Sequence, residues 1–264
     1  MIKMIKLIDI LLENDGGEQP LDILHSRRNK MEREKNYNIA IQKQLQKYIA
    51  DGSKGDLWLN KMPIKYLPDN LKTVGGNLDL RSSHILKLPD NLTVNGFLDL
   101  KHSEITELPE NLTVNGYLSI TMTDIQRIPE SLVVKSHLIA KNLLLESFPN
   151  NLKVGGVIML EDTHFKNGLP DNLTVNTDLD LINTNLTKLP ENLIVNGVLS
   201  IESTDISEIP DSLVVTDSLS VENTPVANKL RRIYRDVYRK TKSGMMSWEI
   251  FKTLYPKINK ITGI

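Results

Sequence analysis

Two aspartates, Asp79 and Asp99, are the clearest candidates in this sequence for acid and base chemistry. They occupy the matching segments Leu-Asp-Leu-Arg and Leu-Asp-Leu-Lys, so a repeating fold would place their carboxylates on neighbouring units. Adjacent carboxylates can divide the roles of general acid and general base. Arg81 and Lys101 follow them closely, however, and a solvated ladder of salt bridges fits these four residues better than a catalytic pair.

Other catalytic or ligand-binding patterns are lacking in the sequence. The histidines are scattered and have no partner at metal-ligand spacing; they are His25, His84, His102, His137 and His164. No glycine-rich phosphate-binding motif occurs. The chain has no cysteine, which excludes disulfides, thiolate metal sites and a cysteine nucleophile. We therefore expect no enzyme, no cofactor and no bound metal.

A repeat must position whatever residues carry the function. A proline preceded by Leu, Ile or Phe returns every 20 or 21 residues, at Pro68, Pro89, Pro109, Pro129, Pro149, Pro170, Pro190 and Pro210. So short and regular a period is typical of a solenoid, in which each unit buries its apolar side by stacking on the next. The prolines are expected at corners, because their fixed φ suits a turn.

Within each repeat, two apolar residues flank one outward position, as in a half-buried strand. These pairs are Leu57/Leu59, Leu78/Leu80, Leu98/Leu100, Leu118/Ile120, Leu138/Ala140, Ile158/Leu160, Leu179/Leu181, Leu199/Ile201 and Leu219/Val221. Small hydroxyl residues follow three positions later in most repeats, and we expect them to point inward and bind buried backbone groups. They are Ser83, Ser103, Thr123, Thr163, Thr184, Thr204 and Thr224. The predicted fold is mainly β, a solenoid of about nine coils.

The flanking segments are expected to cap the exposed ends of the solenoid with helices. Pro20 can open a helix that ends at Gly52, and an apolar stripe beginning at Leu230 has helical spacing. Trp248 and Tyr255 extend the apolar character of the tail. The expected division is residues 1–54 for the N-terminal helical cap, 55–225 for the solenoid and 226–264 for the C-terminal helical cap.

The repeat unit Leu108-Pro109-Glu110-Asn111-Leu112-Thr113-Val114 resembles the leucine-rich repeats of the Leu-Pro type found in secreted bacterial effectors. It differs from them in having Ser or Thr where Asn is usual. The unit is also similar to uncharacterised repeat proteins of large tailed phages. The resemblance covers about two thirds of the chain and implies a leucine-rich-repeat-like scaffold that binds other molecules. Some such effectors also carry a cysteine-dependent ubiquitin ligase domain, which the lack of cysteine excludes here.

Side chains that alternate with the buried leucines should line the outer face of the strands in straight columns. Reading along the columns brings one apolar and aromatic group together on four neighbouring repeats: Phe97, Tyr117, His137, Ile139, Val157 and Met159. Exposed groups of this kind mark contact surfaces. The columns become acidic in the C-terminal half, so a protein partner with an apolar knob and a basic neighbour would fit. A cap or a second copy of the chain covering the patch is the alternative.

Composition leaves the kind of partner and the location of the protein open. The net charge is −1, but basic residues cluster at both ends, which makes nucleic-acid binding the rival to protein binding. No apolar run is long enough for a membrane span, and a chain without cysteine is compatible with a cytoplasmic location. A phage-encoded inhibitor of a host factor or defence protein and a virion or head-associated protein both remain open. The oligomeric state is not predicted.

The first fourteen residues read as an amphipathic helix rather than a secretion signal, because Lys3, Lys6 and Asp9 interrupt any apolar core. The segment resembles the N-terminal peptides that target internal proteins into the heads of T4-like phages. A small helix docked on the cap is the alternative.

Overall fold

The computed structural model describes residues 23–150, 152–241 and 252–264. The chain divides into two units, Met1–Gly52 and Ser53–Ile264, and each is described by itself. The predicted helix of residues 1–14 lies outside the described residues. Among those described, no helix is both long and apolar enough to cross a membrane.

The first unit contains helix α2 (Ile23–Ala50). The helix ends as the sequence predicts, because Gly52 adopts a φ of 84° and its N–H donates to the carbonyl of Ile49 at 3.0 Å. A left-handed glycine of this kind is a common helix terminator. The predicted start at Pro20 lies outside the described residues.

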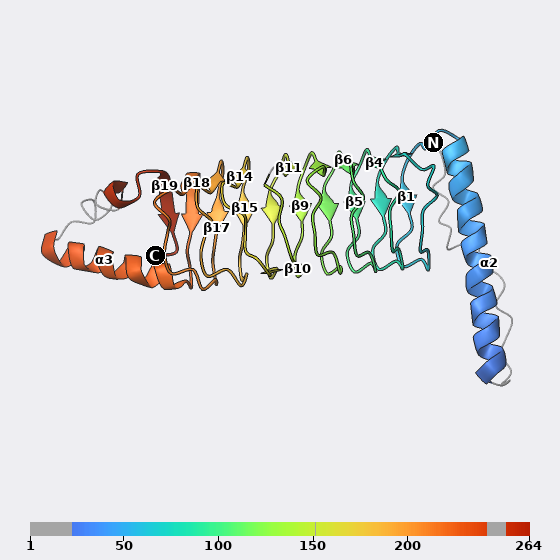
Figure 1. The fold of residues 1–264 in the computed structure, drawn as a ribbon, viewed down its shortest axis with the longest axis horizontal. Coiled ribbons are helices and arrows are strands. Elements are labelled where there is room, and N and C mark those ends of the chain that lie inside the picture. The colour runs from blue at the N-terminus through green and yellow to red at the C-terminus, as the bar shows by residue number, and fades with distance from the viewer. Residues whose placement is uncertain (1–22, 151, 242–251) are drawn as a thin grey trace. The chain divides into compact units, whose positions relative to one another are not determined.

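The second unit is a solenoid of parallel strands with about eight turns (Figure 1). One row of strands, which we call the front row, pairs in sequence order. Its members are β1 (Leu57–Trp58), β3 (Leu78–Asp79), β5 (Leu98–Asp99), β7 (Leu118–Ser119), β9 (Leu138–Ile139), β12 (Ile158–Met159), β15 (Leu179–Asp180), β17 (Leu199–Ser200) and β18 (Val214–Ser220). The pairing brings equivalent residues of successive repeats side by side, for example Leu78 with Leu98.

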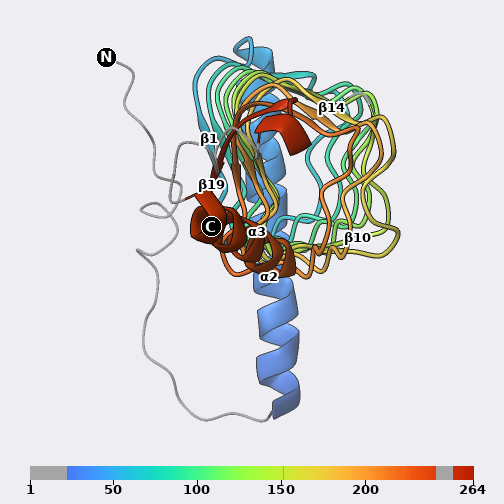
Figure 2. The same cartoon turned by 90° about the vertical axis from the view of Figure 1, so that its left-hand side faces the viewer.

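A second row follows the proline corners. It consists of β2 (Thr73–Val74), β4 (Thr93–Val94), β6 (Thr113–Val114), β8 (Val133–Val134) and β11 (Lys153–Val154), then β14 (Thr174–Val175) and β16 (Ile194–Val195), which join β18. A short pair, β10 (Leu144–Leu145) with β13 (His164–Phe165), lies on a further side. Viewed along the axis, the coils superimpose around a common interior (Figure 2).

The interior is filled by the repeated leucines, and the hydroxyl residues point inward as the sequence predicts. Leu78, Leu80, Leu98 and Leu100 have no exposed surface. In most coils the hydroxyl donates to the carbonyl three residues earlier in its own coil, as Ser83 does to Leu80 at 2.7 Å. Each such bond satisfies a backbone acceptor that water cannot reach.

One coil lacks this hydroxyl and shows why the hydroxyls matter. Leu143 occupies the position, so the carbonyl of Ala140 has no donor within its own coil. Thr163 of the next coil supplies it, donating to Ala140 at 2.7 Å while accepting from the N–H of Leu143 at 3.3 Å. The buried carbonyl is thus satisfied from the neighbouring repeat.

The corners depend on tight backbone conformations. Asn91 and Asn111 have φ values of 59° and 58°, a left-handed region that asparagine tolerates better than most residues. Gly116 serves a different purpose, since a Cβ there would lie 2.7 Å from the backbone carbonyl carbon of Gly96. Its small size lets successive coils approach closely.

The C-terminal segment departs from prediction in one respect. Helix α3 (Pro225–Thr241) forms, and the N–H of Val226 donates to Ile206 at 3.1 Å. The tail beyond it was expected to be helical, but residues Ile258–Thr262 form strand β19, parallel to β18. The edge of β18 offers free backbone donors and acceptors, and pairing with β19 satisfies them.

Candidate functional site

The six predicted partner-binding residues all lie on the outer side of the front row, which we call the front face. Phe97, Tyr117, His137 and Val157 each directly precede a front-row strand, whereas Ile139 and Met159 are within β9 and β12. All of them retain some exposure. The structure places them on four consecutive coils, with Phe97 beside Tyr117, His137 beside Val157 and Ile139 opposite Met159.

The first pair is part of an aromatic stack. The Phe97 and Tyr117 rings lie 4.8 Å apart with an angle of 9° between their planes. Trp58, from β1, meets Phe97 edge-on with the ring centres 6.0 Å apart. Trp58 was not among the predicted site residues, although it is an outward residue of the front row and 39% exposed. The aromatic surface therefore begins at the first strand.

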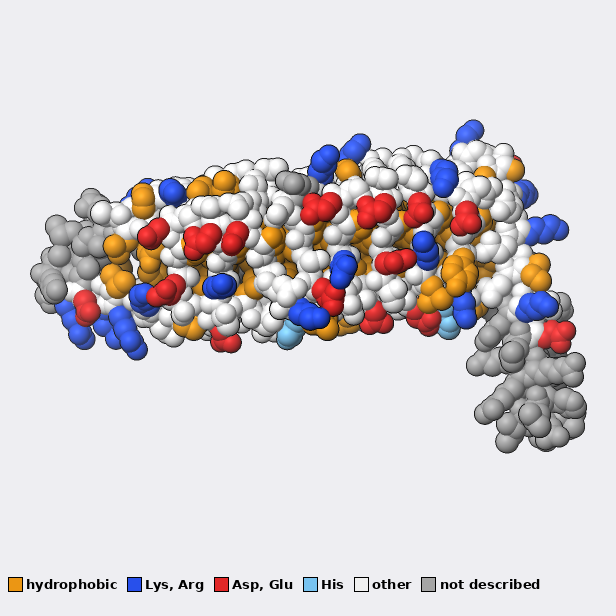
Figure 3. Space-filling model, viewed as in Figure 1, with side chains coloured by type: hydrophobic (Ala, Val, Ile, Leu, Met, Phe, Trp, Pro, Cys, Tyr) orange, Lys and Arg blue, Asp and Glu red, His pale blue; other side chains and the backbone are white. Residues whose placement is uncertain are grey.

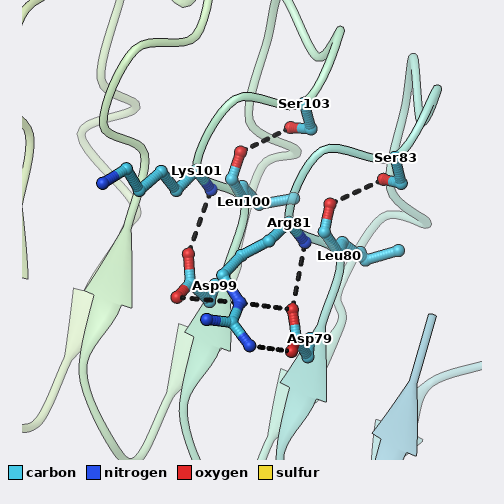
Figure 4. Close-up of polar contacts among 8 residues, drawn as sticks. All are labelled: Asp79, Leu80, Arg81, Ser83, Asp99, Leu100, Lys101 and Ser103. Atoms are coloured by element: carbon cyan, nitrogen blue, oxygen red, sulfur yellow. Dashed lines mark hydrogen bonds and ion pairs between the residues drawn. The ribbon is translucent and has the colours of Figure 1, made fainter. Parts of the chain in front are cut away.

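The two candidate acids, Asp79 and Asp99, are locked in a buried ion-pair cluster (Figure 4). Arg81 donates from Nε and Nη2 to the two carboxylate oxygens of Asp79, at 2.9 and 2.6 Å. Its Nε also lies 3.7 Å from Oδ2 of Asp99. The backbone N–H groups of Arg81 and Lys101 donate to Asp79 and Asp99, respectively, at 3.1 and 3.0 Å. Every carboxylate in the cluster thus has at least two partners.

This cluster corrects the prediction of a solvated ladder. Asp79 is 0% exposed and Asp99 9% exposed, and the hydrogen bond from Lys101 to Asp99 comes from its backbone N–H. The Arg81 guanidinium contacts both carboxylates. Burial raises the pKa of Asp99, opposed by the N–H of Lys101 and the charge of Arg81. The hydrogen bond and charge of Asp79 raise the pKa of Arg81 above its usual value.

Tyr117 links the aromatic stack to this cluster. Burial raises the pKa of its hydroxyl, and the nearby negative charge of Asp99 raises it further. Ionisation of Tyr117 is therefore disfavoured, and the neutral ring serves as apolar surface beside the acid pair.

The middle of the front face is apolar. Ile139 and Met159 are directly opposite each other in the β9–β12 pairing, and both are partly exposed. On the same two coils, the N–H of Val157 donates to Nδ1 of His137 at 3.0 Å. This bond ties the ring of His137 to the next coil.

The C-terminal part of the front face is acidic and less well paired. Lys141 forms an ion pair with Glu161, and Ser220 donates to Glu202. Asp180 accepts a hydrogen bond from the backbone N–H of Ile182 at 3.0 Å. Burial raises the pKa of Asp180, and the negative charges of Glu161 and Glu202 add to the effect.

Hydrophobic side chains follow the length of the solenoid, with acidic side chains in rows beside them (Figure 3). Hollows lie on other sides, such as one of about 750 Å³ between the β8–β11 part of the second row and β14. No group of three or more His, Cys, Asp or Glu residues that could hold a metal occurs within the described ranges.

No family model matches this chain, and no curated protein matches it either. A solved structure of a leucine-rich-repeat domain from a Shigella effector is similar to it, with 16% sequence identity, 81% of this chain and 92% of that chain covered, and a TM-score of 0.37. An overlap this low says nothing about function. The leucine-rich-repeat-like architecture rests on the strand pairing and the buried leucines of this chain.

Proposed function

We propose that this chain is a non-enzymatic protein-binding module that recognises its partner through the front face. The observation that carries the proposal is the run of partly exposed aromatic and apolar side chains on four successive coils, from Phe97 and Tyr117 to Ile139 and Met159. A rigid solenoid presents them at fixed spacing, so little conformational entropy is lost on binding. Contact surfaces of this composition commonly bind protein.

The state of the two acids supports a binding role over catalysis. A general base must be able to accept a proton from a substrate, but the carboxylate oxygens of Asp79 are occupied by Arg81. Asp99, beside it, is covered by the same guanidinium. These groups are suited to holding the surface rigid.

The proposed module is a nine-coil solenoid, residues 55–225, with end segments 1–54 and 226–264 acting as caps. Capping by α3 is supported by its buried residues Val226, Ala227 and Leu230. The resemblance of the repeats to phage proteins supports a phage-encoded inhibitor of a host factor or defence protein, acting in the host cytoplasm. A virion or head-associated structural protein is the alternative.

Nucleic-acid binding through the basic ends is the second alternative. On α3, Arg232, Arg235 and Arg239 are exposed, whereas Lys229 pairs with Glu208 and Arg231 donates to the carbonyl of Gly263. Only part of the basic cluster is therefore free to meet phosphates. Binding to DNA or RNA that weakens steeply with salt would favour this alternative.

The test is an affinity capture that compares two double variants. Tyr117→Ser with Met159→Ser removes apolar surface from the front face without adding charge beside Asp99. The matched control, Leu144→Ser with Thr174→Ser, changes exposed residues on other sides of the solenoid. We expect the wild type and the control to retain the same partner and the front-face variant to lose it, with all three melting normally. Equal capture by all three would contradict the proposal, and a wild-type dimer that the front-face variant abolishes would identify a second copy as the occupant.

A further inference from the structure

The Arg81 cluster provides a template for how this solenoid binds a guanidinium group. Arg81 stands two residues after Asp79, and its side chain reaches over two neighbouring outward positions of the front row, Asp79 in its own coil and Asp99 in the next. The first carboxylate receives two charge-assisted hydrogen bonds, and the second lies close by. Bidentate pairs of this kind are strong and directional.

The same backbone frame recurs at Asp180 with the guanidinium missing. Asp180 accepts the N–H of the residue two positions later, at 3.0 Å, as Asp79 does at 3.1 Å. The residue two positions later is Ile182 rather than arginine. Asp180 therefore keeps a partly buried carboxylate without an ion-pair partner among the described residues.

The next coil supplies a second unmet group at the matching place. Ser200 is paired with Asp180 in the register of β15 and β17, so it occupies the position that Asp99 occupies relative to Asp79. Its hydroxyl oxygen is buried and has no hydrogen-bond partner among the described residues. Buried polar atoms are normally paired, so an acceptor carboxylate and an unpaired hydroxyl lie side by side where the template holds Arg81.

We propose that Asp180, Ile182 and Ser200, which we call the Asp180 site, bind the guanidinium of an arginine side chain from a protein partner. The inference rests on the proposed function, because Asp180 is directly opposite Met159 in the β12–β15 pairing and so adjoins the apolar surface. The arginine stem would pack on Ile182, and the guanidinium would donate to both oxygens of Asp180 and reach Ser200. Glu161 and Glu202 add negative charge near the site, and Lys141, which is paired with Glu161, offsets part of it.

Arginine suits the site better than lysine or a metal ion. A planar guanidinium can donate to both carboxylate oxygens and to a neighbouring acceptor at once, whereas an ammonium is a point charge with stronger hydration. A divalent cation would require several oxygen ligands, but the site offers one carboxylate and one hydroxyl, beside an isoleucine.

The first test restores the template within the chain and needs no partner. Ile182→Arg should place a guanidinium over Asp180 and raise the melting temperature of the full-length protein by about 2–4 °C. The gain should disappear when Asp180→Asn is also present. Two variants serve as controls. Ile182→Gln, which is polar but uncharged, should not raise the melting temperature, and Ile182→Lys should raise it by less than Ile182→Arg does. An equal effect of Ile182→Arg with and without Asp180 would overturn the proposal.

The second test supplies the ligand from solution. N-acetylarginine amide is titrated onto the isotope-labelled full chain, with N-acetylcitrulline amide as the uncharged control of the same shape. We expect saturable NMR shifts at Asp180, Ile182 and Ser200 with the arginine compound, several-fold weaker binding of N-acetyllysine amide, and loss of all shifts in Ile182→Arg. Absent shifts, or equal shifts with the citrulline compound, would contradict the proposal.

These readouts separate the two proposals. If front-face variants leave partner capture unchanged, the proposed function fails while the coupling of Ile182→Arg to Asp180 can still be present. If the coupling is absent but capture depends on Tyr117 and Met159, the front face binds a partner without an arginine at the Asp180 site.

Discussion

The two ends of the front face have the same backbone arrangement but differ in whether an arginine of the chain pairs with the aspartate. Near the N-terminal end, Asp79 is fully buried and doubly bound by Arg81. Toward the C-terminal end, Asp180 has the same backbone hydrogen bond but Ile182 where the arginine would be. One side chain therefore decides whether a carboxylate becomes internal structure or remains available to another molecule.

The comparison also shows how a repeat protein can vary its surface without disturbing its frame. Equivalent residues pair in the same register at both ends, and the buried hydroxyls bind the same carbonyl position in both, as for Ser103 and Thr204. Each coil contacts mainly its neighbours, so a substitution on the face has local consequences.

The largest expected effect is loss of Arg81. Breaking a fully buried ion pair costs about 3–5 kcal/mol, and the half-exposed position of Arg81 lowers our expectation for Arg81→Ala to about 2–3 kcal/mol. Lys101→Ala is the matched control in the next coil and should change stability by less than about 0.5 kcal/mol. Urea denaturation of both variants measures the change in the free energy of unfolding. Similar losses would mean that Arg81 does not hold the N-terminal acids as described.

Removing a buried hydroxyl should lower stability by a smaller amount, and by the same amount at the two ends of the solenoid. Ser103→Ala and Thr204→Val each remove a hydroxyl that donates to a buried carbonyl at 2.6 Å, and each should cost about 1–2 kcal/mol. Thr163→Val should cost more, because it leaves both the Ala140 carbonyl and the Leu143 N–H without this partner. The same unfolding experiment applies. If Ser103→Ala and Thr204→Val lowered the free energy of unfolding by clearly different amounts, the two ends would differ in their interior hydrogen bonds as well as on the front face.

The smallest effect concerns Asp180 and pH. Burial raises its pKa in the folded protein, so ionised Asp180 opposes folding at neutral pH, and wild-type stability from this group increases as pH falls through that raised pKa. Asp180→Asn keeps an acceptor oxygen and should stabilise the protein at pH 7 by less than about 1 kcal/mol. The advantage should shrink on acidification and vanish below the ordinary aspartate pKa. Thermal melts across this pH range measure it, and an advantage that grew on acidification would contradict the assignment.

Much of the fold could be predicted, because its information is local and repeated. The interval between prolines predicts the turns, and the alternation around residues such as Leu98 and Leu100 predicts which side chains are inside. The strand β19 was missed, because its pairing depends on the edge that β18 leaves open rather than on its own sequence pattern. The columns of the front face were readable, but Trp58 and Arg81 were not assigned to the site, since their long side chains contact residues one or two coils away.

By itself, the sequence determined the period, the inward leucines and hydroxyls, and which residues share the outer face, because these follow from chain geometry repeated every 20 or 21 residues. The tertiary structure alone decided the environments of the acids. Whether a carboxylate is buried depends on where a neighbouring side chain lies, and the charge of Asp79 is neutralised by Arg81 while that of Asp180 is not. Position in a repeat is periodic, but solvation and pairing are set by contacts between coils.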